Sequence, residues 1–415
     1  MICALALLTV ATAFRVGEDV HMRGAGWMSK LEVKHVDILP DLTSKLPSNW
    51  SSRFQIAGEL GAGGFGKVFK VKVTCGPGEH FVSAKFIARK AFWSETVLQK
   101  HLKNEVQEVE RLQANWSEYV VSSVGAPVSV ESPELLDPDE HPGVKAGRWV
   151  MMELLNGGSF RDLLKKCSED SKCNCVGATH RACWEALPGM SLAYVLSLVE
   201  EALEGLEAIH YHGLTHMDIK PDNIMLHCQG KRCYSKVIDL GTLCNTMTCD
   251  TRSVVGTRGY LAPEVFTFMP GNLYIPANDV WAMGVTLYTL MYLDTPDYLD
   301  GWSREKLAAY RPEKDSKIPV PHNDMDLLVM EMLNPDHHER IKVPAIRKRL
   351  AAYIESLKPS QEVLDMITKS PSERGLVDKL PPCAWGKAEE KDTGSKGGST
   401  SASFSWLLLA WLLVR

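Results

Sequence analysis

The stretch His216-Met217-Asp218-Ile219-Lys220-Pro221-Asp222-Asn223 carries the most specific signal in the chain. It follows a strongly amphipathic helical pattern that runs from Leu192 to His210. From Phe54 onward, apolar residues alternate as in hairpin strands, whereas after Gly157-Gly158 the spacing is helical, as in Pro276 to Tyr292. Strands followed by helices predict an α+β fold with a small β-rich lobe and a larger α-helical lobe.

A glycine-rich run lies upstream, where Gly61-Ala62-Gly63-Gly64-Phe65-Gly66-Lys67-Val68 joins two predicted strands. A dinucleotide-binding fingerprint would instead lead into a helix. Glycine lets backbone N–H groups approach phosphate oxygens without a Cβ clash. Taken alone, such a run is more often a simple glycine hairpin.

Lys85 lies in Val82-Ser83-Ala84-Lys85 on the third predicted strand, 19 residues after Gly66. A lysine in a strand is usually an edge or snorkelling residue. After a glycine loop, however, a cation that holds the α- and β-phosphates of ATP is expected at this point. A carboxylate must then hold the lysine, and we expect Glu105 on the following helix, with Glu108 as the alternative.

The stretch from His216 to Asn223 resembles the catalytic loop of eukaryotic-type protein kinases, H-R-D-x-x-x-x-N, and the resemblance covers about Phe54 to Ile354. It implies a two-lobed kinase that uses ATP and Mg²⁺. In that family's terms Asp218 accepts the proton of the substrate hydroxyl, Lys220 neutralises charge on the moving phosphoryl group, and Asn223 binds one Mg²⁺.

Further motifs match the family in the expected order. Asp239-Leu240-Gly241 resembles its D-F-G element, with Leu for Phe, which implies Asp239 as the second Mg²⁺ ligand. The run from Gly256 to Glu264 resembles the end of the activation segment. The resemblance gives structural roles to His216, Gly241, Thr257, Glu264, Asp279 and Arg340, with Glu264 pairing with Arg340.

The nucleotide site follows from the same resemblance. Met152 corresponds to the gatekeeper, and backbone groups of the hinge from Glu153 to Leu155 would hydrogen-bond adenine. The residues expected to bind ATP are Gly61, Ala62, Gly63, Gly64, Phe65, Gly66, Val68, Lys85, Met152, Glu153 and Leu155.

Lys220-Pro221 and Thr257 resemble the serine/threonine branch of the family, so a protein hydroxyl is the expected acceptor. Met217 departs from the family because an arginine usually stands there and receives a phosphate on the activation segment. Phosphate on Thr246, Thr248, Thr251 or Ser253 would lack that partner, unless Arg252 replaces it. The alternatives are a pseudokinase that binds ATP without transfer and a secretory-pathway kinase of a small molecule.

The N-terminus and the cysteines bear on the compartment. Residues 2–14 are almost wholly apolar or small, and Ala11-Thr12-Ala13 offers a cleavage site, which predicts a signal peptide at 1–13. Ten cysteines remain after its removal, and the pairs Cys228–Cys233 and Cys244–Cys249 are spaced for local disulfides. Asn49-Trp50-Ser51 and Asn115-Trp116-Ser117 are glycosylation sequons. We therefore expect entry into the secretory pathway, with a cytoplasmic kinase holding buried thiols as the alternative.

The chain of 415 residues divides into an extension at 14–53, a kinase domain at 54–354 (lobes at about 54–152 and 156–354), a linker at 355–403 and an apolar tail at 404–414. The tail is too short to span a bilayer, but with Gly397, Gly398 and Ser399 it resembles a lipid-anchor signal, so peripheral membrane association is an expectation. The net charge of −5 gives no indication of nucleic acid binding.

Overall fold

The computed structural model describes residues 46, 48–63, 66–88, 118–121, 128–130, 147–169, 184–185, 190–229, 232–245, 255–266, 275–292, 321 and 323–368. Several predicted features fall outside these residues. They are the signal peptide, Gly64, Phe65, Glu105, Glu108, Cys249, the sequon at Asn115, and the small residues 397–399 and apolar tail 404–414 of the lipid-anchor signal.

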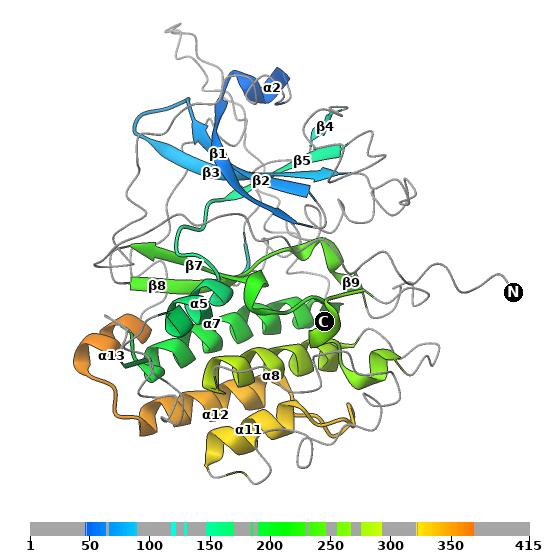
Figure 1. The fold of residues 1–415 in the computed structure, drawn as a ribbon, viewed down its shortest axis with the longest axis vertical. Coiled ribbons are helices and arrows are strands. Elements are labelled where there is room, and N and C mark those ends of the chain that lie inside the picture. The colour runs from blue at the N-terminus through cyan, green and yellow to red at the C-terminus, as the bar shows by residue number, and fades with distance from the viewer. Residues whose placement is uncertain are drawn as a thin grey trace, which may run out of the picture.

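The smaller lobe is an antiparallel sheet with the strand order β1-β2-β3-β5-β4 (Figure 1). Its strands are β1 (Phe54–Gly63), β2 (Gly66–Val73), β3 (His80–Ala88), β4 (Val128–Val130) and β5 (Gly147–Glu153). The short helix α2 (Ser48–Ser51) precedes β1, and its Trp50 packs edge-on against Phe54.

Period-two alternation gives this sheet one apolar face. Phe69 on β2 and Phe86 on β3 pack on Trp149 of β5, with ring centroids 5.6 and 5.1 Å from that of the tryptophan. All three side chains are buried. Aromatic side chains bury large areas, so this cluster fixes which face of each strand is inside.

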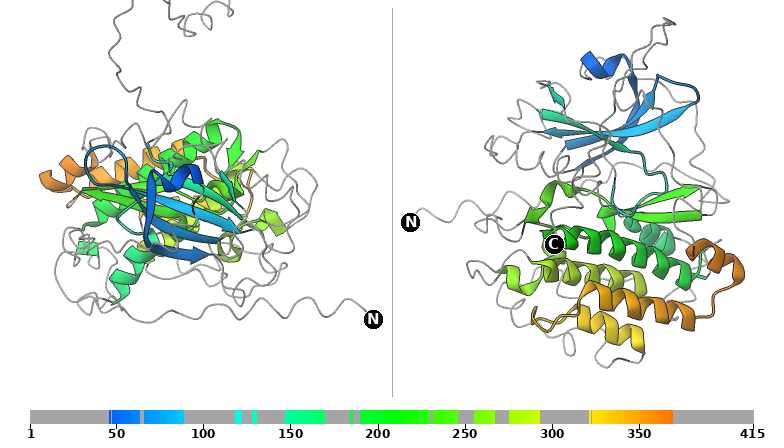
Figure 2. Two further views of the ribbon diagram at one scale, coloured as in Figure 1. Left: turned by 90° about the horizontal axis from the view of Figure 1, so that it is seen from above. Right: turned by 180° about the vertical axis from the view of Figure 1, so that it is seen from behind.

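The larger lobe is mainly helical, as predicted. Its helices are α5 (Phe160–Glu169), α7 (Leu192–Tyr211), α8 (Pro276–Tyr292), α11 (Asp324–Met332), α12 (Val343–Ser356) and α13 (Gln361–Ile367). Figures 1 and 2 both show α7, α8 and α12 side by side beneath the β7–β8 hairpin. The two long helices coincide with the predicted ones to within one residue, and the α+β two-lobed fold is confirmed.

Helix α12 is held on α7 by an apolar stripe and by ion pairs. Val343, Ile346, Leu350 and Ile354 recur at helical spacing and are buried. Between them, Arg347 bonds to three glutamates of α7 at 2.8, 2.7 and 2.5 Å, namely Glu200, Glu204 and Glu207. The stretch predicted as a linker from residue 355 begins with the end of α12 and with α13, whose Met366 is buried.

Short elements of the larger lobe carry the catalytic-loop region. They are β6 (Leu214–Thr215), η3 (Pro221–Asn223), β7 (Ile224–Gln229), β8 (Arg232–Val237), η4 (Leu240–Thr242), β9 (Cys244–Asn245), η5 (Arg258–Tyr260) and η6 (Pro263–Phe266). Strands β7 and β8 form an antiparallel hairpin that leads from Asn223 to Asp239, while β6 pairs with β9.

Cys228 and Cys233 are directly opposed in the β7–β8 hairpin, with their Cα atoms 4.0 Å apart, and a disulfide joins them. Cys244 is also disulfide-bonded, whereas Cys249, its predicted partner, lies outside the described residues. Among the helices that the structure describes, none is both long and apolar enough to cross a membrane.

Candidate active site

Strand alternation decides which residues of β3 face the larger lobe. Val82, Ala84 and Phe86 belong to the core of the small lobe. Because successive side chains point to opposite faces, Ser83 and Lys85 lie on the other face. That face borders the junction with the larger lobe, so the sheet presents a hydroxyl and an ammonium group there.

Lys85 joins the two lobes. Its Nζ donates to Oδ1 of Asp239 at 2.7 Å, and the lysine is only 8% exposed. Asp239 follows β8 in a left-handed backbone conformation, with φ 61° and ψ 61°. Such a conformation is costly for a non-glycine residue and is found preferentially at functional sites. The predicted partner Glu105 lies outside the described residues.

A hydrogen-bonded network surrounds the carboxylate of Asp218, which is 5% exposed. Lys220 Nζ donates to Oδ2 at 2.9 Å, and Thr257 Oγ1 donates to Oδ1 at 2.6 Å. Lys220 Nζ also lies 2.7 Å from Thr257 Oγ1. Asn223 Nδ2 donates to the backbone carbonyl of Asp218 at 2.7 Å and lies 3.1 Å from its Oδ2. The structure thus brings together four residues that sequence reasoning singled out, and Thr257 bonds directly to the Asp218 carboxylate.

Asp279 holds the backbone that carries this carboxylate. Its Oδ2 accepts from the backbone N–H of His216 at 2.7 Å, and its Oδ1 from that of Met217 at 2.8 Å. His210 Nε2 contacts the same carboxylate at 2.8 Å. Met217 has a φ of 70°, which lies in the left-handed region that residues with a side chain disfavour. The structural role predicted for Asp279 rests on these bonds.

His216 connects the catalytic loop to the segment of Asp239. The backbone N–H of Asp218 donates to His216 Nδ1 at 3.2 Å, so Nδ1 is an acceptor. The proton is therefore on Nε2, which donates to the carbonyl of Ile238 at 2.9 Å. The backbone N–H of Ile238 in turn donates to the carbonyl of Asn223 at 3.0 Å, which sets Asn223 and Asp239 beside each other.

Asn223 and Asp239 supply the kind of oxygen that Mg²⁺ prefers. The amide nitrogen of Asn223 is turned to Asp218, which leaves its carbonyl oxygen for a cation. No group of three or more His, Cys, Asp or Glu side chains suited to a metal occurs among the described residues. Two protein ligands agree with the chemistry of Mg²⁺, which keeps waters and completes its shell with substrate phosphates.

The predicted hinge is tied to β3 and β8. Ser83 Oγ lies 3.3 Å from the carbonyl oxygen of Met152 and 3.0 Å from that of Glu153. Lys236 Nζ donates to the Glu153 carboxylate at 2.6 Å. Sequence reasoning missed Ser83 and Lys236; the position of Ser83 two residues before Lys85 was the available signal for the first.

The other described residues that the sequence predicts to bind the nucleotide lie on β1, on β2 and just after β5. Leu155 follows β5 and is buried. Gly61, Ala62 and Gly63 end β1, Gly63 pairs with Gly66 on β2, and Val68 lies opposite Lys85. The described glycines of the run thus lie at the paired ends of β1 and β2, and β2 adjoins the strand that carries Lys85.

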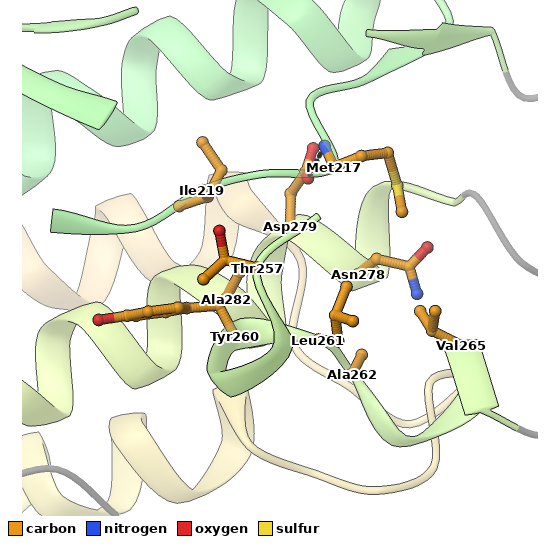
Figure 3. A pocket seen from close by; sticks show the side chains of 10 residues that line it. All are labelled: Met217, Ile219, Thr257, Tyr260, Leu261, Ala262, Val265, Asn278, Asp279 and Ala282. Atoms are coloured by element: carbon orange, nitrogen blue, oxygen red, sulfur yellow. Dashed lines mark hydrogen bonds between the residues drawn. The ribbon is translucent and has the colours of Figure 1, made fainter. Parts of the chain in front are cut away.

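The end of the activation segment is fixed by a buried ion pair. Arg340 donates to both oxygens of Glu264, at 2.6 and 3.0 Å, as the sequence predicted. Gly241 is buried within η4. A cavity of about 10 Å³ lies between this segment, the catalytic loop and α8, with Met217, Ile219 and Thr257 among its walls (Figure 3). It holds nothing larger than a water molecule, so the two segments are nearly close-packed.

Met217 is buried at the position where the resemblance to protein kinases predicts an arginine. It is 5% exposed and forms a small apolar cluster with Cys244 and Val255. Gly256 follows with φ 113°, and a Cβ there would lie 2.4 Å from the carbonyl oxygen of Met217. Both ends of the activation segment therefore contact Met217.

Lys85 and Asp239 are paired between the two lobes, beside an Asp218 carboxylate that Lys220, Thr257 and Asn223 surround. This arrangement is typical of the protein kinase fold. The sequence profile described as "Protein kinase domain" matches residues 54–350. The chain belongs to the protein kinase family.

Curated relatives are distant. A probable protein kinase of Dictyostelium discoideum is 25% identical over 314 residues, covering 73% of this chain and 74% of that protein. MAP3K epsilon protein kinase 1 of Arabidopsis thaliana is 25% identical over 85% of this chain but 22% of its own length. The calcium/calmodulin-dependent protein kinase type II alpha chain of Drosophila melanogaster is 32% identical over 43% of this chain and 35% of its own.

The contact between Gly256 and Met217 yields a stability prediction. Gly256→Ala should lower the free energy of unfolding by at least about 3 kcal/mol, because its φ suits glycine only and its Cβ would overlap a backbone oxygen. Gly213→Ala is the matched control, since Gly213 also has a positive φ of 70° but has open space around its Cβ position. It should cost only about 1–2 kcal/mol. Urea unfolding of both variants measures the difference, and equal losses would contradict the close packing of Gly256.

Proposed function

We propose that the chain is a serine/threonine protein kinase that transfers the γ-phosphoryl group of ATP to a protein hydroxyl. The observation that carries this proposal is the carboxylate of Asp218, which Lys220, Thr257 and Asn223 hold together. A general base needs a fixed position and an available lone pair. The relatives named above are kinases by name, and the intact residue set favours catalysis over a pseudokinase.

The described residues divide the work as follows. Asp218 orients the acceptor hydroxyl and takes its proton. Lys220, already within hydrogen-bonding distance of Asp218, stabilises the negative charge that develops beside it. Lys85, Asn223 and Asp239 would hold Mg²⁺ and ATP, which supplies the phosphoryl group when bound. Thr257 links Asp218 and Lys220 from the activation segment, so the site is complete only when that segment is in place.

Catalysis tests the proposal directly. Asp218→Asn should lower the turnover of protein phosphorylation by roughly 10²–10⁴-fold, since it removes the general base. It should leave Mg²⁺-dependent ATP binding intact, whereas Asp239→Ala should weaken that binding. Asp365→Asn, on the surface of α13, is the matched carboxylate control and should keep full activity. Labelled ATP and binding calorimetry give the two readouts. Nucleotide binding without transfer by the unmodified protein would instead support a pseudokinase.

We further propose that activity does not depend on phosphorylation of the activation segment. The support is the apolar cluster of Met217, Cys244 and Val255, because it offers no cation for a phosphate and holds the segment by packing. Burial of a methionine side chain contributes about 1.5–3 kcal/mol. Phosphatase-treated protein should therefore keep its activity, as measured with labelled ATP. Loss of activity on phosphatase treatment, with recovery on rephosphorylation, would contradict this proposal. It would show that another basic residue, such as Arg252, binds the phosphate.

We also propose that the protein enters the secretory pathway. The support is the disulfide between Cys228 and Cys233 at the tip of the β7–β8 hairpin, since such bonds persist in oxidising compartments. Non-reducing mass spectrometry of material from the native cell should find this bond and a bonded Cys244. Free thiols at these positions, together with an intact Met1 end, would favour the cytoplasmic alternative.

A further inference from the structure

An exposed ion pair lies beside the catalytic network. Arg161 on α5 places Nε and Nη2 each 3.4 Å from Oδ2 of Asp222, and Nη2 donates to the Tyr260 hydroxyl at 3.3 Å. The Arg161 and Asp222 side chains are 36% and 47% exposed. Tyr260 is buried, and burial raises the pKa of its hydroxyl, so that group stays protonated.

The position of this pair relates it to the acceptor substrate. Asp222 is four residues after Asp218 in the same loop, and Tyr260 is three residues after Thr257, which bonds to Asp218. An extended peptide advances only about 3.4 Å per residue. We therefore expect the side chains that flank a hydroxyl placed at Asp218 to come within reach of Arg161 and Asp222.

The ion pair of Arg161 and Asp222 is too weak to contribute much to the stability of the fold. The buried pair of Arg340 and Glu264 has contacts of 2.6 and 3.0 Å and an arginine side chain that is 0% exposed. The contacts of Arg161 with Asp222 are longer and solvated, and such pairs contribute about 0–1 kcal/mol. A substrate carboxylate can compete for this guanidinium at little cost.

The charges at this position then set a preference. An unpaired Asp222 would attract lysine and arginine in a substrate, but Arg161 neutralises it. Arg161 Nη1 makes no hydrogen bond within the part of the chain that the structure describes, so a planar donor remains for a carboxylate.

We propose that Arg161 is a specificity-determining residue, which makes the protein prefer substrates with acidic rather than basic side chains next to the phosphorylated hydroxyl. This proposal rests on the proposed kinase function. Arg161 covers the carboxylate of Asp222 and offers its own guanidinium to the substrate.

The test uses the full chain and two serine peptide pools that differ only in the residues flanking the serine, acidic in one and basic in the other. The readout is the acidic-to-basic ratio of kcat/KM within each variant, which is independent of any overall loss of activity. The ratio should exceed one in the unmodified protein. Arg161→Gln should lower it by roughly twofold to fivefold, the range for an exposed ion pair. Arg161→Lys should largely preserve it, and Asp222→Asn should raise it.

Each outcome decides a separate point. A preference for the basic pool, or an unchanged ratio in both Arg161→Gln and Asp222→Asn, overturns the role of Arg161 while leaving the kinase assignment intact. If Arg161→Gln does not fold, the rise expected in Asp222→Asn still decides. High salt should reduce the differences, since screening acts on exposed charges. Failure of the unmodified protein to phosphorylate either pool or any protein, despite binding Mg·ATP, overturns the proposed function and this inference with it.

Discussion

The carboxylate of Asp279 is the contact on which the catalytic loop depends. It is 1% exposed and accepts two consecutive backbone N–H groups, those of His216 and Met217. Two charge-assisted hydrogen bonds offset the cost of the left-handed backbone at Met217. That backbone turn sends the side chain of Met217 toward the activation segment and Asp218 toward Lys220. The position of Asp218 is thus set by the buried side chain of Asp279.

The neighbouring elements lock to this loop by two different physical means. His216 and Asn223 connect it to the segment of Asp239 through directional hydrogen bonds, which fix the positions of the oxygens that would bind metal. Met217 connects it to the activation segment through packing with Cys244 and Val255, which is less directional. The directional hydrogen bonds thus occur where the oxygens that would bind a cation must be placed accurately. The less directional packing of Met217 only has to hold the activation segment against the loop.

The sequence predicted the fold and the two long helices, because each depends on local patterns. The candidate site residues came instead from the resemblance to protein kinases, and the structure brings Asp218, Lys220, Asn223 and Thr257 together. Alternating residues set β3, and Lys85 follows as the buried cation on the face toward the larger lobe. The ion pair of Glu264 and Arg340 was predicted from the resemblance. What escaped prediction depends on contacts between distant segments. Ser83 contacts the hinge because β3 pairs with β5. Arg161 contacts Asp222 because α5 packs on the catalytic loop.

Burial separates the roles of residues that look alike in sequence. Arg340, Arg347 and Arg161 all pair with acidic residues, yet their environments differ. Arg340 is enclosed, and loss of its partner would leave a buried charge, so it serves the fold. Arg347 is 27% exposed and joins two helices through three carboxylates. Arg161 is the most exposed of the three, has the longest contacts, and pairs with Asp222 in the loop that carries Asp218. Its interaction is the easiest to exchange for one with an incoming substrate, which is what a residue that selects substrates requires.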